Sequence, residues 1–244
     1  ADFHLQNLGI GHYNQAGSFP ISQFIAPMFN GMSEGLVVII ERAAWWLHIA
    51  GILVFLNYLY FSKHLHILLA FPNTYFADLN AKGKLNNLES VTNEVKLMMD
   101  PSADPFAAPA NPEAVPAKFG ASDVQDLNWV QLLNAYSCTE CGRCTSSCPA
   151  NQTGKKLSPR KIMMDTRDRL EEVGRNIDLN KGVFVDDGKS LLNDYITPEE
   201  LWACTTCNAC VEECPINISP LSIIIDMRRY LVMEQSAAPM ELNN

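Results

Sequence analysis

Eight cysteines are arranged in two runs that share one spacing. The runs are Cys138–Cys148 (CTECGRCTSSC) and Cys204–Cys214 (CTTCNACVEEC), and a proline follows each. Cys-x2-Cys-x2-Cys-x3-Cys-Pro is a spacing with which bacterial proteins bind [4Fe–4S] clusters: a tight loop brings three thiolates to three irons, and the fourth cysteine serves the other cluster. The spacing predicts one cluster on Cys138, Cys141, Cys144 and Cys214, and a second on Cys204, Cys207, Cys210 and Cys148.

Structural zinc is the competing interpretation of these thiols. Zinc is commonly held by four ligands in two separated pairs, whereas each run here already contains four cysteines and ends in proline. The duplicated spacing favours iron–sulfur clusters. Gly142 and Asn208 follow the second cysteine of their runs, and both are residue types that tolerate a positive φ, as a tightly wound loop requires.

An apolar segment precedes the cysteines. Ala43–Phe61 contains no Asp, Glu, Lys or Arg, and as a helix it is long enough to cross the roughly 30 Å hydrocarbon core of a bilayer. Aromatic residues lie near both ends, as expected at membrane interfaces: Trp45, Trp46, Tyr58 and Tyr60. We expect a transmembrane helix within residues 36–72. A buried helix of a large soluble protein is the alternative.

The charges indicate an orientation and exclude one class of partner. Arg42 is the one basic residue before the apolar segment, and the other basic residues follow it. The positive-inside rule therefore places residues 73–244 in the cytoplasm, at the inner membrane of a prokaryote. Cysteine clusters without a secretory signal agree with a reducing compartment. A net charge of −9 argues against nucleic-acid binding.

Two histidines are candidate ligands of b-type haem. His48 lies inside the apolar segment, where an ionisable group suggests a function. His66 lies about five helical turns further on, so one continuous helix would present both on the same face. Each haem needs a second axial ligand, which we expect from missing N-terminal helices or another membrane subunit. The alternative is that His48 only bonds a neighbouring helix and that His66 lies at the membrane interface.

The remaining pattern predicts a mainly α protein. We expect an extracytoplasmic loop at 1–35, the transmembrane helix at 36–72, an amphipathic helix (85–99) and a Pro/Ala-rich linker within 73–119, and a helical domain at 120–244. Pro72 should end the membrane helix. Helix starts are predicted at Ser158, Thr197 and Ser219, each of which precedes a proline. Residues 182–185 are the best candidate for a small hairpin.

The segment Trp129–Val173, together with LWACTTCNACVEECPINISP, resembles the α-helical ferredoxin modules of heterodisulfide-reductase-like membrane Fe–S oxidoreductases. The apolar zone resembles the end of the cytochrome b subunit of respiratory nitrate reductases, which makes it part of a haem b helical bundle. The resemblance implies electron transfer between a membrane carrier and a cytoplasmic redox module. In many relatives a module with paired CCG motifs follows, but no cysteine follows Cys214 here.

These observations predict an electron-transfer subunit of a quinone-linked oxidoreductase complex. It would carry electrons between the quinone pool (menaquinone or another quinone), through haem b, and a cytoplasmic CCG-motif or flavin subunit, through two [4Fe–4S] clusters. No nucleotide-binding glycine motif is present in the sequence. A membrane anchor with purely structural clusters is the alternative function, and a soluble ferredoxin whose apolar segment docks in a partner is a third.

Overall fold

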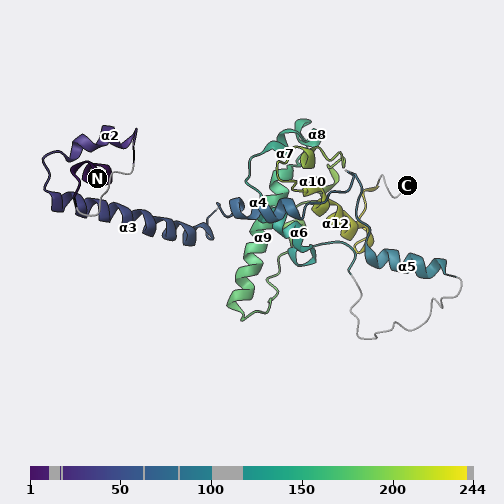
Figure 1. The fold of residues 1–244 in the computed structure, drawn as a ribbon. Coiled ribbons are helices and arrows are strands. Elements are labelled where there is room, and N and C mark those ends of the chain that lie inside the picture. The colour runs from purple at the N-terminus through teal and green to yellow at the C-terminus, as the bar shows by residue number, and fades with distance from the viewer. Residues whose placement is uncertain (11–16, 18, 63, 82, 101–117, 241–244) are drawn as a thin grey trace. The chain divides into compact units, whose positions relative to one another are not determined.

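The computed structural model describes residues 1–10, 17, 19–62, 64–81, 83–100 and 118–240. These residues are mainly helical, as the sequence predicts, and within them there is no strand, only an isolated bridge between Leu192 and Ile196. The chain divides into two compact units, Ala1–Lys63 and His64–Asn244. Figure 1 shows the elements of each unit.

The first unit contains more helix than the sequence analysis expected. Residues 1–35 were predicted as a loop, but they include α1 (Asp2–Leu8), α2 (Ser22–Ile25), the 3-10 helix η1 (Ala26–Phe29) and the start of α3. α1 packs on α3 through two fully buried side chains, Leu5 and Val37. These short apolar contacts explain why a segment of polar composition becomes helical.

α3 (Glu34–Leu59) is the one helix in the described part of the chain that is long and apolar enough to cross a membrane. Most of its apolar side chains are exposed, including Leu47 and Val54. The helix ends earlier than expected, because the Ser62 hydroxyl donates to the carbonyl oxygen of Leu59 (3.1 Å) and competes with further helical hydrogen bonds.

A separate helix, α4 (Leu65–Tyr75), follows in the second unit. The expectation of one helix over residues 36–72 is therefore wrong in its extent. Pro72 does not end α4 either, because it lies inside the helix, which continues for another turn. The hydroxyl of Thr74 bonds the carbonyl of Ala70 at 2.8 Å in that turn and adds a hydrogen bond next to the one that proline cannot make.

The rest of the second unit is a set of helices and irregular turns (Figure 1). In chain order they are α5 (Glu89–Met99), η2 (Val124–Asp126), α6 (Trp129–Ser137), α7 (Arg143–Ser146), α8 (Pro149–Gln152), α9 (Pro159–Leu179), η3 (Leu191–Tyr195), α10 (Pro198–Trp202), α11 (Ala209–Glu212) and α12 (Pro220–Met233). α5 is shorter than the predicted 85–99. Most of the predicted Pro/Ala-rich linker lies outside the described residues, which resume at Lys118.

α9 is the central helix of this unit and packs against α6, α7, α12 and η3. Its apolar side joins a core that also includes residues of α10 and α12. All three predicted helix starts are confirmed. Ser158, Thr197 and Ser219 are N-cap residues whose hydroxyls accept a backbone N–H three positions further on, the contact that stabilises the first turn of a helix.

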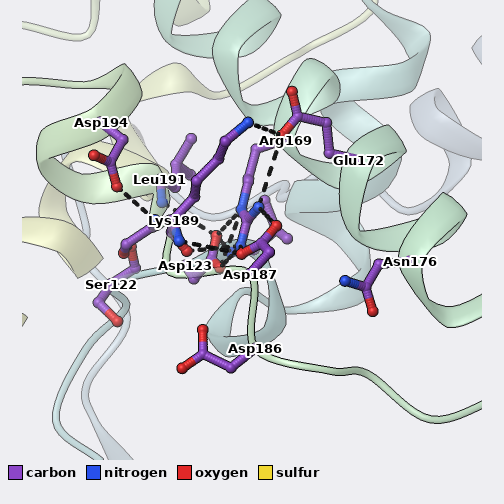
Figure 2. Close-up of polar contacts among 12 residues, drawn as sticks. Ser122, Asp123, Arg169, Glu172, Asn176, Asp186, Asp187, Lys189, Leu191 and Asp194 are labelled. Carbon is purple, nitrogen blue, oxygen red and sulfur yellow. Dashed lines mark hydrogen bonds and ion pairs between the residues drawn. The ribbon is translucent and has the colours of Figure 1, made fainter. Parts of the chain in front are cut away.

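A buried arginine connects α9 to the chain on either side of it (Figure 2). The Arg169 side chain is fully buried, and its guanidinium donates to both carboxylate oxygens of Asp123 (2.8–3.2 Å) and of Asp187 (2.6 and 3.0 Å). It also donates to the carbonyl of Lys189 at 2.7 Å. Because a buried charge is costly unless it is paired, this network fixes residues 187–191 against η2 and α9.

Candidate iron–sulfur site

The two cysteine runs fold into matching loops. The residue before the second cysteine has a left-handed backbone in both runs, with φ of 59° at Glu140 and 56° at Thr206. The residue after that cysteine is left-handed too, with φ of 81° at Gly142 and 61° at Asn208, as the sequence predicts. Gly142 and Asn208 then cap the short helices α7 and α11. The same chain path therefore recurs around each set of thiols.

Backbone N–H groups point at the first sulfur of each loop. The N–H of Thr206 donates to Cys204 Sγ at 3.4 Å, and the N–H of Glu140 donates to the Cys138 thiol in the equivalent place. Ile218 N–H donates to Cys214 Sγ at 3.3 Å. Hydrogen bonds of this kind stabilise thiolates and tune the potential of a bound cluster. The two left-handed residues make these donors available by turning the loop back on itself.

Cys214 lies with the first run rather than with its own. The pKa of the Cys138 thiol is raised by burial and also by the neighbouring thiols of Cys144 and Cys214. Burial raises the pKa of Cys144 as well, and Cys141 and Cys214 contribute in the same direction. The structure therefore brings together the four cysteines that the spacing predicts for the first cluster.

Cys148 lies with the second run. Burial raises the pKa of Cys204, and the thiols of Cys148 and Cys207 add to that effect. Burial and nearby thiols, those of Cys144, Cys148, Cys204 and Cys207, raise the pKa of Cys210 to about 12. Cys144 is the one residue of the first group in this environment, so the two groups of thiols are neighbours.

A cavity of about 120 Å³ lies at the first group of cysteines. Its walls include Cys138, Cys141, Cys144, Cys210 and Cys214, and its other lining residues come from α4, from α9 and from the segment after Cys214. The contributors from α4 are His66 and Ala70. The cavity is thus enclosed by sulfur on several sides and lies within the second unit.

The donor set fits a positively charged group with several binding corners. Buried thiols with raised pKa values do not ionise without a cation, and thiols that coordinate a metal are deprotonated by it. Among the described residues, no three His, Cys, Asp or Glu side chains lie close enough to share a single ion. Thiolates around a cubane bind different irons and need not converge on one ion, unlike the ligands of tetrahedral zinc.

Arg228 supports the second loop from α12. Its guanidinium donates to the carbonyl oxygens of Leu201 (2.6 and 3.0 Å) and Cys204 (2.5 Å), the last carbonyls before the cysteine run, and lies 5.0 Å from the centre of the Trp202 ring. Burial lowers the pKa of Arg228. Sequence reasoning missed this role, because the arginine reaches the loop from a helix that begins after both cysteine runs.

The two candidate haem ligands fall in different units. His48 is exposed on α3 in the first unit, and His66 belongs to α4 and lines the cavity of the first cysteine group. One continuous helix was the geometric basis for pairing them, and α3 ends at Leu59, before His66. The pairing on a shared helix face is therefore not retained. No signal in the sequence distinguished a histidine beside the cysteines from one in a membrane helix.

Comparison with known proteins gives a consistent result for the cysteine domain. Residues 137–218 match the model of the 4Fe-4S dicluster domain. The chain is 33% identical to the probable iron-sulfur-binding oxidoreductase FadF of Bacillus subtilis, over 89% of this chain and 32% of that protein. It is 31% identical to the EtfAB:quinone oxidoreductase of Syntrophomonas wolfei, over 94% of this chain and 31% of that protein.

A third relative is a probable membrane-anchored ferredoxin of Chromohalobacter salexigens, 35% identical over 50% of this chain and 20% of that protein. No solved structure matches the chain significantly. The chain spans about a third of the length of the first two relatives. Residues 137–218 thus form a 4Fe-4S dicluster domain, and the chain is homologous to iron–sulfur oxidoreductases, including the iron–sulfur subunit of heterodisulfide reductase and membrane-anchored ferredoxin.

Proposed function

We propose that this chain is a membrane-anchored electron-transfer subunit. It carries electrons between membrane quinone and a cytoplasmic redox partner of the flavin or CCG-motif class, through two [4Fe–4S] clusters held by the cysteine groups described above. The clusters supply the one-electron chemistry, and the protein positions them and sets their potentials. Residues 73–244 lie on the cytoplasmic side in this proposal, following the distribution of basic residues.

The exchange of the fourth cysteines between the two loops is the observation that carries the proposal. Because Cys214 lies with the first run and Cys148 with the second, the two clusters would be adjacent, as a relay requires. Cys141 and Cys207 are exposed to solvent, so each group of thiols has a side at which electrons can enter or leave. Clusters with a purely structural role would gain nothing from such exposure.

The membrane and quinone parts of the proposal have separate support. α3 has the length and composition of a membrane span, and one relative is a membrane-anchored ferredoxin. The name of the Syntrophomonas wolfei relative pairs EtfAB with quinone, and the alignment with that protein extends over 94% of this chain.

Reoxidation by quinone tests the proposed function. The chain is purified without oxygen, placed in lipid vesicles and reduced with dithionite, and the excess reductant is removed. Addition of menaquinone should restore the visible absorbance of the oxidised clusters, because each reduced cluster gives up one electron and the quinone takes two electrons and two protons. Clusters that stay reduced with quinone, yet are reoxidised by a soluble oxidant, would contradict the relay and favour the anchor with structural clusters.

A b-type haem on α3 is part of the same proposal, with His48 as one axial ligand and the other from a different helix. The visible spectrum of the dithionite-reduced protein in its native membrane should show b-type bands. His48→Leu should abolish them, whereas His66→Leu should keep them, because His66 lines the cysteine cavity. Bands that survive His48→Leu would exclude this ligand.

A further inference from the structure

α4 presents two different faces, and the first is turned toward the cysteine domain. Along this face His66 and Ala70 line the cavity of the first cysteine group. Leu69 accepts a hydrogen bond through its carbonyl from Ser137 Oγ at 3.4 Å. Asn73 is buried, and its side-chain amide donates to the carbonyl of Ile216 at 2.8 Å. α4 is therefore packed on α6 and on the segment after Cys214 (Figure 1).

The opposite face of α4 is apolar and exposed. Ile67, Leu68, Phe71 and Tyr75 are between 50% and 79% exposed, and they follow one another at helical spacing. The surface continues over Phe76, whose ring meets the half-exposed ring of Trp129 edge to face at 4.7 Å. α4 contains no Asp, Glu, Lys or Arg, although the solvent-facing side of a helix in a water-soluble domain is normally charged or polar.

The position of α4 in the chain indicates what covers this face. α3, the candidate membrane span, ends at Leu59, and α4 begins at Leu65. So short a connection reaches about 20 Å at most, which keeps the start of α4 near the membrane surface if α3 spans the bilayer. Tyrosine and tryptophan, both present on the exposed surface, are the residues enriched at the headgroup level.

We propose that α4 is an interfacial helix whose outer face (Ile67, Leu68, Phe71 and Tyr75) lies in the headgroup region of the bilayer while its inner face closes the cavity of the first cysteine group. The proposal rests on the proposed membrane anchorage by α3. A helix with its side chains is about 10–12 Å thick, so the first cluster would lie about one helix diameter from the membrane surface. The first cluster is then the one that exchanges electrons with the membrane carrier.

Photocrosslinking to lipid tests this placement. Phe71, Val54 and Leu179 are replaced, one at a time, by the photoreactive residue benzoylphenylalanine in the cluster-loaded chain. Each variant is placed in vesicles of phosphatidylcholine and phosphatidylglycerol whose acyl chains carry a click-chemistry tag. Leu179 is the matched control, because it is 83% exposed where Phe71 is 76% exposed, and Figure 1 shows the end of α9 away from α4. Val54 lies in the middle of α3 and reports on the span itself.

The expected result is strong lipid labelling at position 54, and labelling at position 71 that is several times that at position 179. Labelling at 54 with equal or no labelling at 71 and 179 would overturn the interfacial helix and leave the membrane anchor intact. Absence of labelling at 54 would overturn the anchor and, with it, the placement of α4. In native membranes, a crosslink from position 71 to a protein instead of lipid would also overturn the proposal, because a partner protein would then cover this face.

Discussion

At the scale of single residues, the assignment of each fourth cysteine to the opposite loop can be tested by pairs of substitutions. Cys148→Ala should remove one cluster, about four of the eight irons. Adding Cys204→Ala should cost no further iron, because both residues serve the same cluster. Adding Cys138→Ala instead should remove the second cluster as well. The measurement is iron and acid-labile sulfide per chain in protein purified without oxygen.

The two double variants are matched, since each lacks one cysteine in addition to Cys148. If ligands came from within one run only, Cys148→Ala with Cys138→Ala would keep half of the iron and Cys148→Ala with Cys204→Ala would lose all of it. This reversal would contradict the crossed arrangement. Far-ultraviolet circular dichroism serves as the control for folding, because a collapsed domain would lose helix as well as iron.

The sequence predicted the residues whose identity carries the information and missed those placed by the fold. Gly142 and Asn208 were recognisable because their types favour a left-handed backbone. Glu140 and Thr206 adopt the same conformation, but nothing in their side chains announces it. His66 was assigned to the membrane helix, because its distance from His48 fits a helix face and because the helix break after Leu59 depends on local hydrogen bonds.

At the scale of secondary-structure elements, Arg169 should be one of the most sensitive positions outside the cysteines. Arg169→Leu leaves Asp123 and Asp187 without their cation, and breaking a buried pair in this way costs about 3–5 kcal/mol. Arg175→Leu is the matched control on the same helix, because Arg175 is 74% exposed and pairs with Glu171 at 3.2 Å on the surface. Denaturant unfolding followed by circular dichroism compares them. Equal losses in the two variants would contradict a structural role of the network.

The same network should make stability depend on acid pH. The hydrogen bonds from Arg169 lower the pKa of Asp187 from 3.8 to about 2. Because the folded value lies below the unfolded one, the stabilising contribution is present above the unfolded pKa and is lost as the pH falls toward the folded one. Unfolding free energies measured from mildly acidic pH down to about 2.5 should therefore fall less steeply for Asp187→Asn than for the native chain. Parallel curves would show that Asp187 does not contribute.

Elements were predictable where a local signal sets their boundary. The N-caps of α9, α10 and α12 depend on a hydroxyl and a following proline, and the sequence places all three correctly. The helices within residues 1–35 depend on the packing of Leu5 and Val37, which lie far apart in the sequence. Tertiary contacts of this kind override local composition, so the predicted loop was wrong.

At the scale of the whole molecule, the sequence was most informative about chemistry and least informative about the arrangement of its parts. The duplicated cysteine spacing indicated a two-cluster domain, and the match to the 4Fe-4S dicluster domain agrees with it. The membrane carrier, the haem and the cytoplasmic partner are proposals. The chain covers about a third of its first two relatives, so these parts concern a larger assembly.

The central claim is that this chain holds two reducible [4Fe–4S] clusters close enough to interact. Electron paramagnetic resonance of the anaerobically purified, dithionite-reduced chain tests it most directly. We expect signals from two reduced [4Fe–4S] clusters with the broadening caused by magnetic interaction between them, simplified to one isolated cluster in Cys148→Ala. Signals from a single isolated cluster in the native chain, or none from a protein that contains zinc instead of iron, would contradict the claim.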